Sequence, residues 1–293
     1  MIFDESTLRK LNRLTLVATQ VRAGVMKGDR RSVKRGSSIE FADYRDYTPG
    51  DDLRRVDWNV YARLDRPFMK LFEEEEDLAV HVLIDGSQSM DWGAGEQNKF
   101  QYALRLAGAL GAIALAGGDR LTVAILSDGK SGQQIGPVRG VQNTLQLLQF
   151  LERQKAGGIT DLNHSLRHYA MTPRRPGVSF LISDLFCAEG HISGLAQLQS
   201  RGHEVSLLHI LAPEELDPPL AGDLRLMDVE NGQAQDVSLD SGMRALYRRK
   251  LLAWRDEIQA TCKKRSVRYL GLSTAQTWDR VVLHQMRSMG VVK

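Results

Sequence analysis

The stretch that decides the fold is residues 78–90, LAVHVLIDGSQSM, an apolar run that ends in an aspartate, a glycine and two serines. A near-continuous run of this kind is typical of a strand buried on both faces of a mainly parallel sheet. In open α/β sheets, ligands bind beyond the carboxyl ends of the strands. Asp85, Ser87 and Ser89 are therefore candidate ligands of a hard cation such as Mg²⁺. The alternative is a plain polar turn that Gly86 allows.

The chain beyond this strand alternates between helix and strand patterns. Apolar residues recur at helical spacing over 100–115 and 141–151, and a further helix ends near Gly202. Short apolar runs predict buried strands over 121–127, 178–183 and 205–211. Strands separated by helices imply right-handed crossovers, so the sequence predicts an α/β fold with a doubly wound, mainly parallel sheet.

Two later segments complete the predicted site. The glycine turn GGITDL at 157–162 presents the hydroxyl of Thr160 at the start of a helix, and Asp184 follows the strand at 178–183. Oxygen ligands from separate segments could surround one Mg²⁺ or Mn²⁺ octahedrally, with a position left for water or for a partner's carboxylate. The predicted metal ligands are Asp85, Ser87, Ser89, Thr160 and Asp184.

The amino-terminal part contains a helix pattern and two charged segments. Residues 6–24 predict a short amphipathic helix, and residues 25–38 form a basic stretch that we interpret as a mobile, solvated loop. Residues 40–70 combine opposite charges with aromatic side chains, which favours a network of ion pairs over a free carboxylate pair that binds metal. The acidic run at 73–77 is interpreted as a solvated edge. The candidate partner contacts in this part are Arg54, Arg55, Asp57 and Trp58.

The carboxyl-terminal part predicts a hairpin and a long helix. Residues 224–230 and 233–239 flank Asn231-Gly232, a strong hairpin signal. A long helix with an exposed basic face follows over 241–265, then a strand at 269–272 and a short helix at 279–289. The basic face could dock an acidic partner, although a solvated face is the commoner outcome.

The order Asp85, Ser87, Ser89, then Thr160, then Asp184 resembles the metal-ion-dependent adhesion site of von Willebrand factor A domains. The stretch EFADYRDYTPGDDLRRVDWNVYAR at 40–63, followed by DGSQSM, resembles the bacterial domain-of-unknown-function 58 family from about Gly36 to the C-terminus. These resemblances imply an A-like, Rossmann-type domain over 78–293 with a hairpin and helix insertion at 212–265. Residues 1–77 would form a separate amino-terminal region. The family resemblance also implies MoxR-type AAA+ ATPases and other A-domain proteins as partners.

The composition of the chain limits which classes of protein remain possible. The 293 residues are 42% apolar and 26% charged, as in soluble globular proteins, and the net charge of +3 is too small to indicate nucleic acid. Cys187 and Cys262 form no metal or disulfide pattern, which favours reduced thiols in a cytosol. No secretory signal is apparent, and the longest apolar run, 106–118, is shorter than the roughly 18 residues of a membrane span. We expect a cytoplasmic protein without a transmembrane segment, with peripheral association with a membrane complex left open.

The expected function is a metal-dependent binding module and not an enzyme, so no catalytic residue is assigned. A haloacid dehalogenase-type phosphotransferase needs a second aspartate where Ser87 stands, and neither a nucleophile elbow nor a phosphate-binding glycine-lysine loop is present. Cys187 near His191 is a weak nucleophile pair. The alternatives are a scaffold with a vestigial metal site that binds through residues 40–63, and a Mg²⁺-dependent hydrolase. The partner, the pathway, the oligomeric state, the cation and the order of the basic loop stay open.

Overall fold

The computed structural model describes residues 3–18, 39–48, 51–74, 78–127, 130–187, 190–219, 222–227 and 234–293. The chain forms two compact units, one made of Met1–Lys27 with Leu78–Lys293 and a smaller one made of Gly28–Asp77. This division differs from the predicted amino-terminal region 1–77, because residues 3–18 pack with the larger unit. The predicted basic loop over residues 25–38 lies outside the described residues.

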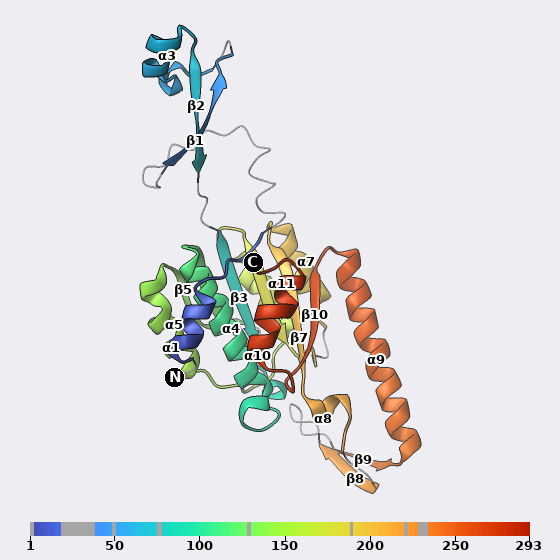
Figure 1. Cartoon of the computed structure of the whole chain (residues 1–293). Helices are drawn as coiled ribbons and strands as arrows, with labels where there is room; N and C mark the ends of the chain where they lie inside the picture. The colour runs from blue at the N-terminus through green and yellow to red at the C-terminus, as the bar shows by residue number, and fades with distance from the viewer. Residues whose placement is uncertain are drawn as a thin grey trace. The chain divides into compact units, whose positions relative to one another are not determined.

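The larger unit is built on a six-stranded sheet with the order β10-β7-β6-β3-β4-β5 (Figure 1). Neighbouring strands are parallel except for β5, which runs antiparallel to β4 at the edge. The prediction of an α/β fold with a mainly parallel sheet is confirmed. The strands are β3 (Ala79–Asp85), β4 (Arg120–Ser127), β5 (Lys130–Arg139), β6 (Val178–Ser183), β7 (Glu204–Leu211) and β10 (Arg268–Ser273).

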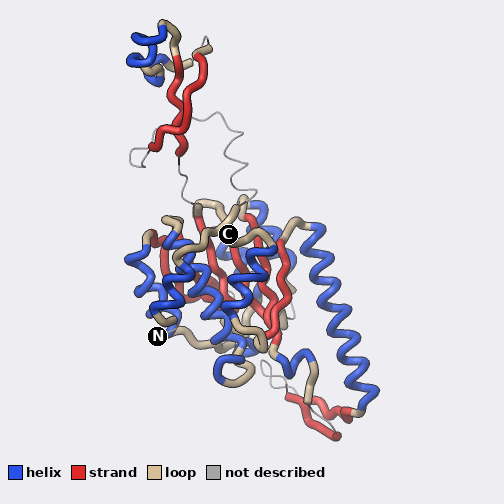
Figure 2. The backbone as a smooth tube through the Cα atoms, in the orientation of Figure 1, coloured by secondary structure: helices blue, strands red, loops and turns tan. Residues whose placement is uncertain are grey.

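Helices cover both faces of this sheet, as Figure 2 shows. Alternate residues of β3 contribute to separate cores, since Val82 and Ile84 join one cluster and Leu83 joins the other. The first cluster includes α4 and α5, and the second includes α6 and α7. Burial on both faces explains why β3 carries no polar alternation. These helices are α4 (Lys99–Ala116), α5 (Thr144–Glu152), α6 (Leu162–Met171) and α7 (Ile192–Ser200).

The predicted helix over 6–24 is wrong over residues 12–18, and residues 19–24 lie outside the described residues. Helix α1 spans Glu5–Leu11, and the chain then extends beside the carboxyl terminus. Thr15 N–H donates to the Lys293 carbonyl, and Lys293 N–H donates back to Thr15 over 2.9 Å. Leu14, Leu16 and Ala18 are buried in alternation, which is the period of a strand and not of a helix.

The carboxyl-terminal elements follow the predicted order. A short helix α8 (Pro213–Leu216) leads to the hairpin of β8 (Gly222–Met227) and β9 (Ala234–Leu239). The predicted Asn231-Gly232 turn lies outside the described residues. The long helix α9 (Ser241–Lys264) follows, and after β10 the chain ends in α10 (Trp278–Arg280), a π-helical turn at Val281–Gln285 and α11 (Met286–Ser288).

The smaller unit pairs β1 (Ile39–Asp46) with β2 (Phe68–Glu74) in antiparallel fashion and adds α3 (Trp58–Leu64). The predicted ion-pair network is present in part, because the guanidinium of Arg45 donates to both carboxylate oxygens of Asp51 at 2.6 and 2.8 Å. Two of the acidic residues at 73–77 fall in β2, and the others lie outside the described residues.

Candidate functional site

The predicted site residues lie at the switch point of the sheet. From β3 the chain builds outward to β4 and β5, and it then returns to place β6 on the other side of β3. Asp85 ends β3, and Asp184 directly follows β6, so both carboxylates lie at the carboxyl ends of adjacent parallel strands. Crevices at such switch points are where open α/β sheets bind ligands.

Asp85 is a buried carboxyl held at both oxygens. Ser87 N–H donates to its Oδ1 at 3.0 Å, and the hydroxyl of Ser183 donates to its Oδ2 at 2.6 Å. Burial and the negative charge of Asp184 raise the pKa of Asp85 to about 6. A divalent cation close to this carboxyl would oppose both effects, because a nearby opposite charge favours the ionised form.

Ser87, Ser89 and Asp184 present oxygens at the spacing of metal ligands. The Oγ atoms of Ser87 and Ser89 lie 3.0 Å apart, and Ser89 Oγ lies 3.3 Å from Asp184 Oδ1. Neighbouring ligands of an octahedral Mg²⁺ with bonds of about 2.1 Å are themselves about 3.0 Å apart. The donor set therefore fits a hard divalent cation. Ser89 is half-buried, whereas Asp85, Ser87 and Asp184 are buried.

Thr160 reaches the same edge through backbone contacts between two loops. Gln88 N–H donates to the Gly158 carbonyl at 2.9 Å, and Gly157 N–H donates to the Gly86 carbonyl at 2.8 Å. The hydroxyl of Thr160 is directed at the Leu126 carbonyl, 3.4 Å away. Thr160 is thus beside the other four residues, but its hydroxyl is engaged with the end of β4.

Two backbone features tighten the site. A Cβ on Gly86 would lie 2.7 Å from Ile125 Cγ2 and 3.0 Å from the Leu126 carbonyl oxygen, so this turn has space only for glycine. Leu185, directly after Asp184, has a φ of 60°, which a leucine rarely adopts. Phe186 N–H donates to Asp184 Oδ1 at 3.1 Å, which helps to hold this strained turn. Strain of this kind clusters at functional sites.

Lys99 and Glu215 belong to the site and were not predicted. Lys99 is fully buried, and its ammonium donates to Asp184 Oδ2 at 2.6 Å and to Glu215 Oε1 at 2.5 Å. Burial raises the pKa of Glu215, although Lys99 acts in the opposite direction. One signal was available, because Lys99 lies four and eight residues before Ala103 and Ala107 on the buried face of α4. A lysine at a core position needs a buried counter-charge.

The side chains behind Asp184 are aromatic. The ring of Phe186 stacks on that of Trp254 from α9, with centroids 5.5 Å apart, and His209 Nε2 bonds to the Asp184 carbonyl at 3.0 Å. Burial, followed by the charges of Asp85 and Asp184, raises the pKa of Cys187 to about 12. This thiol is therefore almost fully protonated near neutral pH.

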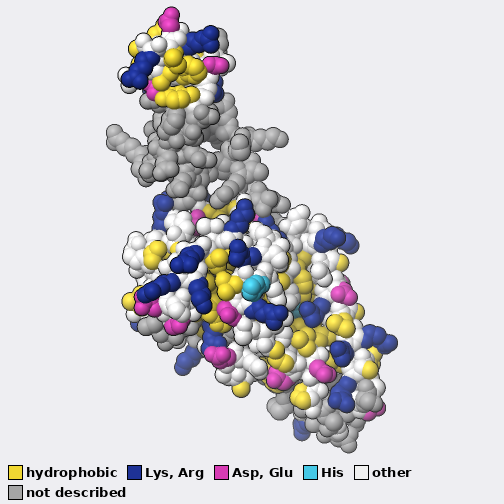
Figure 3. Space-filling model, in the orientation of Figure 1, with side chains coloured by type: hydrophobic (Ala, Val, Ile, Leu, Met, Phe, Trp, Pro, Cys, Tyr) yellow, Lys and Arg dark blue, Asp and Glu magenta, His cyan; other side chains and the backbone are white. Residues whose placement is uncertain are grey.

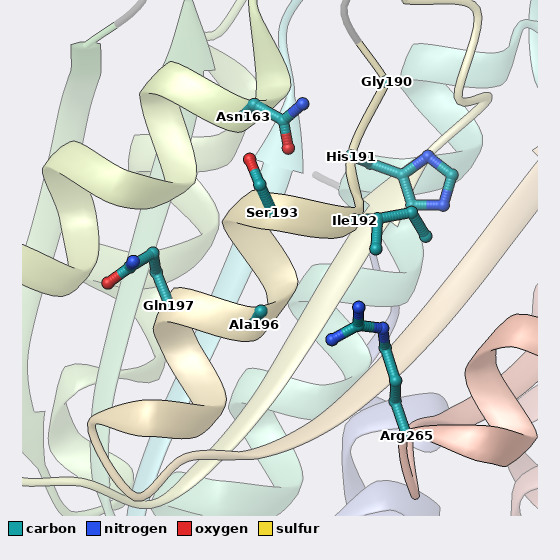
Figure 4. A pocket seen from close by; sticks show the side chains of 8 residues that line it. All are labelled: Asn163, Gly190, His191, Ile192, Ser193, Ala196, Gln197 and Arg265. Carbon is teal, nitrogen blue, oxygen red and sulfur yellow. The ribbon is translucent and has the colours of Figure 1, made fainter.

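Within the described residues, no group of three His, Cys, Asp or Glu side chains is placed to hold a metal ion. The candidate site differs from such groups because three of its five residues, Ser87, Ser89 and Thr160, offer hydroxyls. A separate surface pocket of about 520 Å³ lies at the start of α7, where Asn163, Ser193, Gln197 and Arg265 line it (Figure 4). It contains none of the five predicted ligands.

The candidate partner contacts of the smaller unit have different roles in the structure. Asp57 is buried and caps α3 by accepting from Asn59 and Val60 N–H, and it also accepts from the hydroxyl of Tyr44. Arg54 and Trp58 are exposed. The side chain of Arg55 lies outside the described residues.

The comparisons with known proteins identify the family. The family model "Protein of unknown function DUF58" matches residues 43–257. The chain belongs to the DUF58 family. An uncharacterized protein of Mycobacterium tuberculosis is 29% identical over 280 residues, which cover 94% of this chain and 88% of that protein. An uncharacterized protein of Mycobacterium avium is 24% identical over 147 residues, which cover 50% of this chain and 86% of that protein.

Two solved structures are also similar to the DUF58 chain. The conserved hypothetical protein BatB from Bacteroides thetaiotaomicron aligns with a TM-score of 0.46 and 19% identity, over 73% of this chain and 98% of that one. An aerotolerance-related membrane protein from Bacteroides fragilis aligns with a TM-score of 0.43 and 17% identity, over 72% of this chain and all of that one. Among the helices of the described residues, none has the length and apolarity needed to cross a bilayer.

Proposed function

We propose that this DUF58 protein is a metal-dependent protein-binding module whose larger unit is a von Willebrand factor A-like domain with a metal-ion-dependent adhesion site. Ser87, Ser89 and Thr160 would hold Mg²⁺ or Mn²⁺, and Asp85 and Asp184 would ligate the ion or its waters. The bound ion would supply an electrophilic centre for a carboxylate of the partner. The observation that carries the proposal is the spacing of Ser87 Oγ, Ser89 Oγ and Asp184 Oδ1 at the switch point.

The surface around the site supports a protein partner. Each of the three loops that carry site residues also exposes one large apolar side chain. Trp92 is 48% exposed in the loop after Ser89, Ile159 is 57% exposed beside Thr160, and Phe186 is 39% exposed two residues after Asp184. Exposed aromatic and aliphatic side chains around a polar centre are typical of protein interfaces.

The state of the Cys187 thiol argues against one catalytic role, that of a cysteine nucleophile. With its pKa raised to about 12, Cys187 supplies little thiolate for nucleophilic attack. The partner class, a MoxR-type AAA+ ATPase or another A-domain protein, rests on the family resemblance. A cytoplasmic location belongs to the same proposal.

Ser89→Ala tests the metal site because it removes one half-buried hydroxyl and no charge. We expect the affinity for Mn²⁺, measured by isothermal titration calorimetry, to fall by about tenfold or more. Ser193→Ala, at an exposed serine of α7, is the matched control and should bind Mn²⁺ like the wild type. Equal affinities in all three proteins would refute the proposed ligand set.

Affinity capture from native lysate tests the binding role. Wild type and Ser89→Ala are each used in Mg²⁺ and in chelator, and mass spectrometry identifies the captured proteins. The partners that wild type loses in chelator should be the same ones that Ser89→Ala loses in Mg²⁺. Recovery of an AAA+ ATPase only with wild type in Mg²⁺ would support the proposed partner class. Partners that remain in chelator would move the function to another surface.

The apolar side chains around the site give a second measurement with the partner so identified. Ile159→Ala should weaken binding by about fivefold to thirtyfold, as truncation of an interface residue commonly does. Leu252→Ala removes a comparably exposed side chain on α9 and should leave the affinity unchanged. Surface plasmon resonance in Mg²⁺ compares the two variants.

A scaffold role for the smaller unit is the second candidate. Hydrophobic side chains gather on its visible face (Figure 3). Leu53, Trp58 and Leu64 of this unit are more than half exposed. Charge reversal at Arg54 and Arg55 would remove partners that depend on this surface and spare those that depend on the metal.

A further inference from the structure

Lys99 places its side-chain ammonium beside the proposed metal site. Its side chain is fully buried in the first turn of α4, and its ammonium lies 5.0 Å from the centre of the Phe186 ring. Two carboxylates bind it, Asp184 at 2.6 Å and Glu215 at 2.5 Å. Water therefore contributes little to the screening of this charge.

Asp184 is shared between this ammonium and the proposed cation position. Its Oδ2 accepts from Lys99, and its Oδ1 lies 3.3 Å from Ser89 Oγ, on the side where the serine hydroxyls gather. A divalent ion at Ser87 and Ser89 would then lie on one side of a carboxylate whose other side already holds a cation. Two cations that share one carboxylate each gain less from it, and they also repel each other.

Glu215 competes with Asp184 for the ammonium of Lys99. Its Oε2 accepts from Ala212 N–H at 2.7 Å, and its backbone carbonyl accepts from the hydroxyl of Tyr247 in α9 at 2.7 Å. Glu215 is thus anchored through its carboxylate at the start of α8 and through its backbone by α9, and its carboxylate shares the ammonium with Asp184. If the Glu215 charge were removed, Asp184 would be the one remaining carboxylate that binds the Lys99 ammonium.

We propose that Lys99 is a built-in cation that keeps the affinity of the site for Mg²⁺ or Mn²⁺ low, so that the ion is held firmly only when a partner's carboxylate completes its coordination. The inference rests on the proposed function and names Lys99 as the residue that makes metal binding depend on a partner. It predicts opposite effects for the two members of the ion pair. Loss of the Lys99 charge strengthens metal binding, and loss of the Glu215 charge weakens it.

The test measures Mn²⁺ affinity of the full-length protein without any partner, from the electron paramagnetic resonance signal of free Mn²⁺. We expect Lys99→Met to bind Mn²⁺ about tenfold more tightly than the wild type. Glu215→Gln should bind it more weakly. Circular dichroism spectra confirm that each variant is folded.

Because Lys99→Met leaves two buried carboxylates without their cation, Lys99→Met/Glu215→Gln serves as the variant that retains the net charge of the pair. It frees Asp184 Oδ2 and should also bind Mn²⁺ more tightly than the wild type. Weaker binding in this folded double variant, with measurable binding in the wild type, would overturn the inference and leave the metal site standing. Absence of binding in both the wild type and the double variant would overturn the proposed function itself.

Discussion

Lys99→Met is expected to lower the free energy of unfolding by about 3–5 kcal/mol, the range for removing one partner of a buried ion pair. The methionine keeps the apolar stem but leaves Asp184 and Glu215 without the ammonium that both contact. The side chains of Lys99 and Asp184 are 0% and 1% exposed, so solvent does not replace the lost partner. Urea unfolding followed by circular dichroism measures the difference.

Two further variants test whether this loss of stability comes from the buried ion pair. Lys250→Met changes an exposed lysine of α9 and should shift the free energy of unfolding by less than about 0.5 kcal/mol. Lys99→Met/Glu215→Gln should be more stable than Lys99→Met, because removing both members of a buried pair costs less than breaking it. A loss below about 1 kcal/mol in Lys99→Met, typical of exposed pairs, would contradict the role of Lys99 as a buried charge.

The central strands could be predicted because burial on both faces leaves a continuous apolar signature. The limits predicted for β6 match those observed, and those predicted for β4 and β7 differ by one residue. Strand β5 was missed because it is an edge strand with an irregular register, and its side chains around Gln133 and Gln134 are exposed. The alternating apolar pattern of a half-buried strand is weak in such a segment.

The part of the candidate site that one turn forms could be predicted, because neighbouring residues fix its geometry. The part that distant segments form could not. Ser87 and Ser89 point to one side of one turn, so their pairing follows from local spacing. Lys99 meets Asp184 85 residues away and Glu215 116 residues away. These contacts form only when the fold brings the start of α4, α8 and the residue after β6 together.

We expect the buried histidines to make the fold sensitive to acid. His81 bonds through Nδ1 to the hydroxyl of Tyr169 at 2.8 Å and through Nε2 to the Arg175 carbonyl at 3.0 Å. Since a carbonyl only accepts, Nε2 carries a proton. Burial lowers the pKa of His81 to about 3, so the ring is neutral near neutral pH. His203 bonds through Nδ1 to Ser179 Oγ at 2.7 Å, and its ring lies 4.8 Å from that of His81.

The free energy of unfolding is expected to fall steeply from about pH 6.5 to pH 4. Burial lowers the pKa of His81 and His209 to about 3 and that of His191 and His203 to about 4, from 6.5. Below pH 6.5 the unfolded chain therefore binds protons that the folded chain excludes, and each pKa unit amounts to about 1.4 kcal/mol. The raised pKa values of Asp85, about 6, and of Glu215 act in the opposite direction but involve two groups against four.

His203→Asn separates this mechanism from general acid denaturation. The asparagine offers Ser179 an oxygen near the position of Nδ1 but takes up no proton, so the pH slope of the unfolding free energy should decrease while stability at neutral pH changes less. The midpoints of urea unfolding at several pH values between about 7 and 4 measure this slope. His164→Asn removes an exposed histidine and should keep the wild-type slope. If His203→Asn also kept it, the acid sensitivity would originate elsewhere, because a buried neutral His203 must contribute to a proton uptake that occurs only on unfolding.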